Sequence, residues 1–169
     1  FWRLMALITG FWFLLVTAST TVTLRYSLQA LREQIDDILM STVATLAHAP
    51  GVQRVVAQGY CDEEMTEYLT DVVRNTRDLQ YITIADADAD RLYHIDPDFI
   101  GLPFEGGDEQ RALAGEIYLS DATPDNFQRQ HRAFHPIFDE GGQVMGFVMA
   151  SATFESIDKL RSEIFSTYG

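Results

Sequence analysis

The chain has 169 residues, with 12 Lys and Arg against 25 Asp and Glu, which gives a formal net charge of −13 at pH 7. Residues 1–25 contain only Arg3 and Arg25 as charged residues, so the remainder carries a net charge of −15. A charge of this sign argues against nucleic acid as a partner and against docking on an anionic lipid surface.

The first predicted element is a transmembrane helix over residues 1–25. No residue from Leu4 to Leu24 is charged, and this is about the length that an α-helix needs to cross the hydrocarbon core. The hydroxyl residues within 17–23 are compatible with it because they can bond back to carbonyls one turn earlier. A cleaved signal peptide is the alternative, but the run passes directly into helical sequence over residues 25–32, without the composition break of a cleavage site.

A stalk helix over residues 26–49 is predicted to lead from the membrane into the domain. Its apolar residues recur at the three- and four-residue spacing of one helix face: Leu28, Leu31, Ile35, Ile38, Leu39, Val43 and Leu46. Pro50-Gly51 interrupts the pattern. The apolar face can pair two protomers or pack on the sheet, and we expect a homodimer in the full-length protein.

Residues 50–169 are predicted to form one domain with a single core. A short helix over 52–58 should stop at Gly59, and Asp62 should cap a second helix whose apolar face begins at Met65. Cys61 is the only cysteine, so an intrachain disulfide is impossible.

The pattern changes to strands at residue 81. Residues 81–84 are β-branched and aromatic, and the alternating Ala and Asp residues of 85–90 are typical of a hairpin connection. The three aspartates there suggest a calcium loop, but that loop needs Gly at its sixth and Glu at its twelfth position, which Arg91 and Pro97 occupy. A hairpin without calcium is therefore predicted.

The second half continues with strands around one short helix. Asp108 is predicted to cap a helix over 110–113, and strand resumes at 117–119. Two long antiparallel strands, 128–138 and 144–153, should be joined by the turn 139–142, and a last helix should cover 155–165. This order of elements is typical of an α+β domain with a central antiparallel sheet.

Two arginines and a histidine are the candidate ligand-binding residues. A guanidinium pairs with a carboxylate through charge-assisted hydrogen bonds worth roughly 1.5–3 kcal/mol each, so Arg91 and Arg132 could hold the two ends of a dicarboxylate. Arg132 shares a strand face with Phe134, unless Arg132 lies on the solvated face of an edge strand. Arg91 and His94 reach one pocket only if their strand ends or bulges near Tyr93.

The sequence favours no other chemistry. A hydrolase needs a nucleophile and an oriented base, and no such motif is present. Zinc at His131 and His135 is the metal alternative, but histidines in this strand pattern are more often solvated. We therefore expect a binding domain without catalytic activity, cofactor or metal in this segment.

These residues resemble the periplasmic sensor domains of citrate and four-carbon-dicarboxylate sensor histidine kinases (CitA/DcuS type). The resemblance covers nearly everything after the membrane segment and is densest in five motifs: Tyr81-Ile82-Thr83-Ile84-Ala85-Asp86, Arg91-Leu92-Tyr93-His94, Ile100-Gly101-Leu102-Pro103-Phe104, Arg132-Ala133-Phe134-His135-Pro136-Ile137-Phe138-Asp139 and Gly142-Gln143-Val144-Met145-Gly146. It implies an extracytoplasmic PAS-like (PDC) fold with a long N-terminal helix continuous with the first membrane helix. The ligand pocket would lie on the central antiparallel sheet.

The resemblance also assigns the site. It implies ligand contacts from three polar side chains, two aromatic walls and one hydroxyl: Arg91, His94, Arg132, Phe104, Phe134 and Thr83. Phe134 is similar to the four-carbon type, since the citrate type carries lysine there. His135 replaces a usual threonine, Met149 replaces the serine of the citrate type, and residues 123–129 match poorly. The implied ligand is succinate, fumarate or malate, with citrate less favoured.

The function implied by the resemblance is sensing across the inner membrane by a two-component histidine kinase. Ligand binding in the periplasm would close the pocket and displace the C-terminal helix relative to the stalk. Two alternatives stay open. The same domain could serve a chemoreceptor or a cyclic-dinucleotide enzyme, or the protein could be an anchored protein-interaction module in which Arg91 and Arg132 are exposed.

Overall fold

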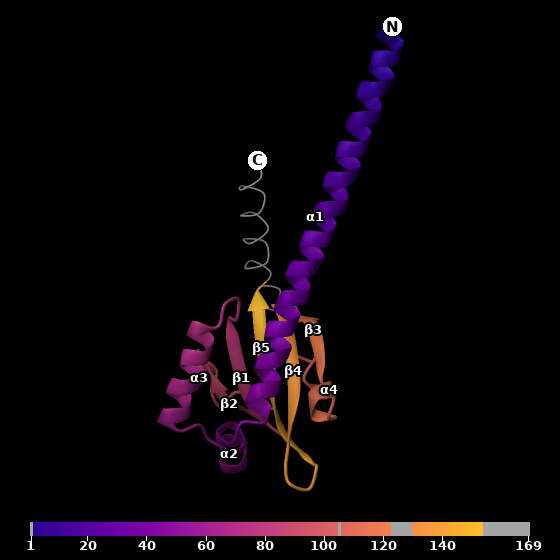
Figure 1. The fold of residues 1–169 in the computed structure, drawn as a ribbon. Coiled ribbons are helices and arrows are strands. Elements are labelled where there is room, and N and C mark those ends of the chain that lie inside the picture. The colour runs from indigo at the N-terminus through magenta and orange to yellow at the C-terminus, as the bar shows by residue number, and fades with distance from the viewer. Residues whose placement is uncertain (1, 105, 123–129, 154–169) are drawn as a thin grey trace. The chain divides into compact units, whose positions relative to one another are not determined.

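A computed structural model describes residues 2–104, 106–122 and 130–153 (Figure 1). The predicted helix over 155–165 and the poorly matching segment 123–129 lie outside the described residues. The chain divides into two compact units between Gln34 and Ile35, and helix α1, Trp2–Ala47, contributes to both.

The first unit is the N-terminal part of α1. Within the described residues, α1 is the one helix long and apolar enough to cross a membrane, and its apolar stretch is not buried in the protein. Its hydroxyls bond back along the helix as predicted, for example Thr17 Oγ1 to the Phe13 carbonyl at 2.9 Å and Thr20 Oγ1 to the Val16 carbonyl at 2.8 Å. The division of α1 into membrane and stalk segments stays a prediction.

The second unit is built on a five-stranded antiparallel sheet with the order β2-β1-β5-β4-β3. The α+β prediction is confirmed, and the strands begin and end close to the predicted positions: β1 Tyr81–Asp86, β2 Arg91–His94, β3 Tyr118–Ala122, β4 Gln130–Phe138 and β5 Val144–Thr153. The central strand β5 therefore connects the two halves of the sheet, with β1 on one side and β4 on the other (Figure 1).

Three helices precede the sheet. From Ile35 onward the predicted apolar face of α1 is buried in the domain except for the half-buried Ile38, and Leu39 and Val43 are fully inaccessible to solvent. Helix α2, Pro50–Gln58, ends at Gly59 in the left-handed conformation, with φ +75°. Helix α3, Glu63–Asn75, is capped by the Asp62 carboxylate, which accepts from the Met65 N–H at 2.8 Å, as predicted.

The two predicted turns are closed by aspartates. Asp86 Oδ1 accepts from the backbone N–H groups of Asp88 and Asp90 at 3.0 and 2.9 Å. Asp139 Oδ1 accepts from those of Gly141 and Gln143, at 2.8 Å each. The first aspartate of this hairpin, Asp86, therefore stabilises a turn.

The predicted cap of the short helix is wrong. Helix α4, Gln110–Leu113, is preceded by Glu109, whose side chain makes no capping hydrogen bond. Asp108 instead accepts a hydrogen bond from the guanidinium of Arg132 at 3.0 Å. A charged donor inside the protein is a stronger partner for a carboxylate than the backbone N–H groups of a one-turn helix.

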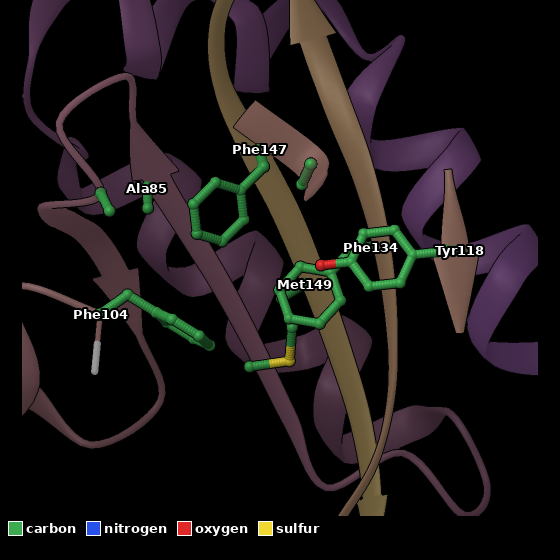
Figure 2. Packing of buried hydrophobic residues seen from close by; sticks show 8 residues of the cluster. Ala85, Phe104, Tyr118, Phe134, Phe147 and Met149 are labelled. Atoms are coloured by element: carbon green, nitrogen blue, oxygen red, sulfur yellow. The ribbon is translucent and has the colours of Figure 1, made fainter. Parts of the chain in front are cut away.

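A buried aromatic cluster lies on the sheet face that carries α4 (Figure 2). Phe134 is its centre, since its ring stacks on Tyr118 with centroids 5.0 Å apart and meets Phe104 edge-on at 6.0 Å. Phe147 contacts both Phe104 and Phe134. This cluster supports one side of the candidate site.

Candidate functional site

A pocket of about 100 Å³ opens beside this cluster. Its walls come from four strands, from the 3-10 helix η1, Pro97–Phe99, and from the loop that follows it. The lining residues are Tyr81, Thr83, Arg91, His94, Asp96, Phe99, Phe104, Gln130, Arg132 and Met149. Five of the six predicted site residues are therefore brought together. Phe134 is the exception, because it is fully buried in the aromatic cluster behind Phe104.

A bulge explains how Arg91 and His94 reach the same pocket. In the β1–β2 pairing His94 lies opposite Thr83 and Arg91 lies opposite Ala85, with a register shift between Ile84 and Ala85. Thr83 and Ala85 point to one face of β1, so their partners on β2 share that face although they are three residues apart. The predicted irregularity of this strand is confirmed.

Arg91 is held against the loop after η1. Its Nη1 donates to the carbonyls of Leu102 and Pro103 at 3.3 and 2.6 Å. Its Cζ lies 5.1 Å from the ring centre of Phe104 and 5.6 Å from that of Phe99, within range of a cation–π interaction. The guanidinium is therefore oriented by the protein at one end of the pocket.

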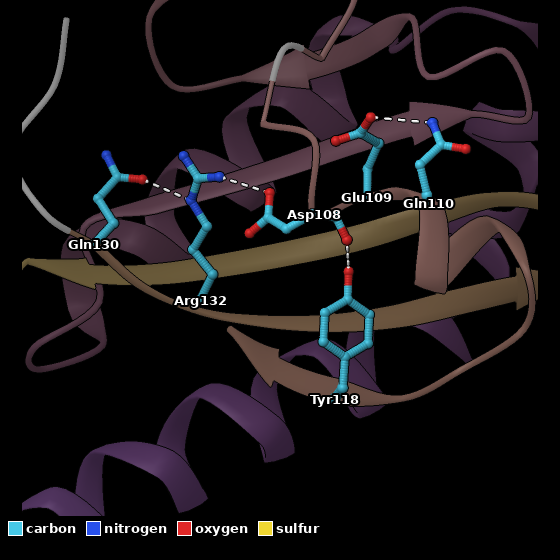
Figure 3. Close-up of polar contacts among 6 residues, drawn as sticks. All are labelled: Asp108, Glu109, Gln110, Tyr118, Gln130 and Arg132. Carbon is cyan, nitrogen blue, oxygen red and sulfur yellow. Dashed lines mark hydrogen bonds and ion pairs between the residues drawn. The ribbon is translucent and has the colours of Figure 1, made fainter. Parts of the chain in front are cut away.

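Arg132 is more deeply buried than Arg91, and Figure 3 shows its contacts with Gln130 and Asp108. It is 5% exposed, and β4 is an inner strand between β5 and β3, so the alternative of a solvated edge strand is contradicted. Nε donates to Gln130 Oε1 and Nη1 donates to Asp108 Oδ1, each at 3.0 Å. Among the described residues no hydrogen bond is made by Nη2, so a carboxylate in the pocket could complete the guanidinium's coordination.

His94 is packed between aromatic rings. It stacks on Tyr81 with centroids 5.5 Å apart and meets Phe99 edge-on at 5.0 Å. Burial lowers the pKa of His94 below its usual 6.5, and the nearby Arg91 charge lowers it further, while the hydrogen bond with Asp96 acts in the opposite direction. When Nδ1 accepts from the Asp96 N–H at 3.0 Å, the neutral ring carries its proton on Nε2 and can donate from there.

Two buried hydroxyl groups lie on the sheet face that carries the pocket. Thr83 Oγ1 and Ser151 Oγ are buried and have no hydrogen-bond partner within the described part of the chain. Ser151 lies two residues beyond Met149 on β5, on the same face, and pairs with Arg132 across the sheet. Sequence reasoning identified Thr83 but missed Ser151, although the alternation of β5 places it beside the pocket.

Gln130 and Asp108 were also missed. Gln130 directly follows the poorly matching segment 123–129, and Asp108 has the local pattern of a helix cap. Only the fold shows that both contact Arg132.

The two histidines of β4 lie on the opposite face, and the expectation that they are solvated is wrong. His131 Nε2 lies 2.6 Å from Asp36 Oδ1 and its Nδ1 lies 2.5 Å from Asp121 Oδ1. His135 is buried as well and meets the ring of His48 at 5.2 Å. Among the described residues no group of three or more side chains could hold a metal ion.

Comparison with known proteins agrees with this geometry. Residues 26–163 match the family described as single cache domain 3. The sensor histidine kinase DcuS of Escherichia coli K12 is 30% identical over 118 residues, which is 69% of this chain and 21% of DcuS. The sensor histidine kinase CitA of Klebsiella pneumoniae is 37% identical over 90 residues, or 53% of this chain and 16% of CitA.

The solved structures show the same architecture. The crystal structure of the E. coli DcuS sensor domain superposes with a TM-score of 0.63 and 25% identity, covering 76% of this chain and 95% of that domain. The chain spans only part of its curated relatives, 16% of the length of CitA and 25% of the length of CitS. The expected PAS-like fold and the resemblance to sensor kinases are confirmed, and the chain belongs to the single cache domain 3 family.

Proposed function

We propose that this chain is the extracytoplasmic sensor domain of a membrane-bound two-component histidine kinase and that its pocket binds a small dicarboxylate. The observation that carries the proposal is the convergence of Arg91, Arg132 and His94 on one pocket in a protein whose net charge is −13. Such a local excess of donors and positive charge in an acidic chain favours an anionic ligand.

The arrangement of the two arginines suits a ligand with two charged ends. Arg91 is on β2 and Arg132 is on β4, with β1 and β5 between them. Three strand spacings of about 4.8 Å separate their backbones by roughly 14 Å, so both side chains must extend inward over the sheet to meet one molecule. A dicarboxylate lying above Thr83 and Met149 would join the two halves of the sheet.

The charges that line the pocket favour a four-carbon acid. Among the described lining residues, Arg91 and Arg132 are the two permanent cations, and no lysine is present. Two arginines match the two carboxylates of succinate, fumarate or malate, whereas citrate has three carboxylates. We therefore infer that the succinate, fumarate and malate class is favoured over citrate.

The proposed signal is a closure of the pocket. Ligand carboxylates would draw the loop after η1, which holds Arg91, toward Arg132 on β4. Because β5 lies between β1 and β4, this closure would move the strand that leads to the C-terminal segment. We propose that this displacement, relative to the N-terminal membrane helix of a homodimer in the cell inner membrane, is transmitted to the cytoplasm.

The kinase output is favoured over a chemoreceptor or cyclic-dinucleotide enzyme because the curated relatives CitA and DcuS are named sensor histidine kinases. A second membrane span followed by a helix with a phosphorylatable histidine in the full-length protein would support it.

Calorimetric titration of the full chain in detergent with succinate, fumarate, malate and citrate tests the binding proposal. Saturable heat with a four-carbon acid supports it. Heat with none of them, together with no thermal stabilisation by any carboxylate, would favour the protein-interaction module.

A further inference from the structure

The ion pair between Asp108 and Arg132 places a negative charge directly beside a residue that lines the proposed ligand site. Asp108 Oδ1 lies 3.0 Å from Arg132 Nη1, and the two side chains are only 15% and 6% exposed. Figure 3 shows the carboxylate beside the guanidinium that also contacts Gln130. One of the two arginines is therefore largely neutralised by the protein itself.

Asp108 is held in this position by its surroundings. Its backbone carbonyl accepts a hydrogen bond from the Tyr118 hydroxyl, and the Tyr118 ring is stacked on Phe134. A Cβ atom at Gly106 would lie 2.3 Å from Asp108 Oδ1 and 2.8 Å from Arg132 Nη1, so the backbone packs closely around the pair. These contacts fix the Asp108 backbone beside Arg132, and the carboxylate itself is held by the ion pair.

The formal charges around the pocket then nearly cancel, because Asp108 and Glu109 offset the two arginines. Arg91 and Arg132 contribute two positive charges, and His94 contributes a third only when protonated. Asp108 removes one, and the neighbouring Glu109, whose Oε2 is buried without a partner in the described residues, adds negative charge on the same loop. Asp96 also lines the pocket, but it is exposed and solvent screens its charge.

We propose that Asp108 is a specificity-determining residue that limits the ligand to two carboxylates. This inference rests on the proposed carboxylate-binding function. Arg91 and the remaining donors of Arg132 meet the two ends of a dicarboxylate. Among the described lining residues, a third carboxylate meets no further permanent positive charge, and the charge of Asp108 repels it.

The substitution Asp108→Asn tests the proposal because asparagine keeps an acceptor oxygen for Arg132 and removes the charge. Affinities for succinate and for propane-1,2,3-tricarboxylate, which is succinate with one added carboxymethyl group, are measured by calorimetry on the full chain in detergent. The affinity ratio of succinate to the tricarboxylate is expected to fall on the order of tenfold, the effect of one charge at roughly 10 Å with an effective dielectric constant near 20.

Two variants serve as controls. Asp108→Glu restores the charge and should restore the preference for succinate. Glu116→Gln removes the same charge from the exposed pair of Glu116 with Arg111, 2.7 Å apart, and should leave the ratio unchanged.

The outcomes separate this inference from the proposed function. If the wild-type chain binds neither acid, the proposed function fails. If the wild type binds succinate but Asp108→Asn leaves the ratio unchanged, or Glu116→Gln shifts it equally, the role of Asp108 is refuted. Should both Asp108→Asn and Asp108→Ser fail to fold by circular dichroism, Asp108 is a structural residue only and the proposal is overturned.

Discussion

Replacing Asp36 by Asn is expected to lower the free energy of unfolding of the domain by about 1–2 kcal/mol. Asp36 accepts from the buried His131 ring at 2.6 Å, and Asp121 binds its other nitrogen at 2.5 Å. A hydrogen bond from a ring N–H to a carboxylate is charge-assisted. Such a bond contributes about 1.5–3 kcal/mol. The expected loss is smaller because Asp36 is 28% exposed and asparagine retains an acceptor.

Urea denaturation of the full chain in detergent, followed by near-ultraviolet circular dichroism, measures this loss. Asp37→Asn is the matched control, since Asp37 is the exposed neighbour on the same helix and should stay within about 0.5 kcal/mol of wild type. The double substitution of Asp36 and Asp121 should cost less than the two single losses combined, because both act on His131. An Asp36→Asn variant as stable as Asp37→Asn would refute the reasoning.

Three further outcomes are expected from the site. Phe134→Leu should destabilise the domain by about 1–3 kcal/mol in denaturation, because aromatic contacts are lost, and should change succinate affinity less than threefold in calorimetry. Unchanged stability with a large loss of succinate affinity would make Phe134 a ligand contact. Because burial lowers the pKa of His94, its ring is neutral above pH 6.5. Succinate affinity should rise as the pH falls from 8 toward that lowered pKa, and the proton taken up on binding should be seen as buffer-dependent heat. The pH dependence of the affinity should disappear in His94→Asn. Gly106→Ala should weaken succinate binding at least tenfold because the new methyl group would lie 2.4 Å from Phe104 Cε1, whereas Gly141→Ala in the distant turn should bind as wild type.

Local sequence patterns were sufficient for most of the fold. The β-branched and aromatic residues of 81–84 identified β1, and the turn composition of 139–142 identified β4 and β5. The Asp62 cap was predicted because its partner is only three residues away. Arg91, His94 and Arg132 were identified because few other side chains can bind a carboxylate.

The errors concern partners that are distant in the chain. Asp108 was assigned to a helix cap because its true partner is 24 residues away, and His131 was expected in solvent because Asp36 is 95 residues upstream. Phe134 shares a strand face with Arg132. Only the pairing of β3 with β4 shows that the Phe134 ring stacks on Tyr118 and does not line the pocket. Local periodicity contains no information on these contacts.

The most direct test of the central claim is calorimetric titration of succinate into the wild-type chain and into Arg132→Ala. One molecule should bind per chain with saturable heat, and the variant should bind about 10- to 100-fold more weakly because charge-assisted hydrogen bonds to the ligand are lost. Equal affinity in the two proteins, or no heat from the wild type with succinate, fumarate or malate, would contradict the account.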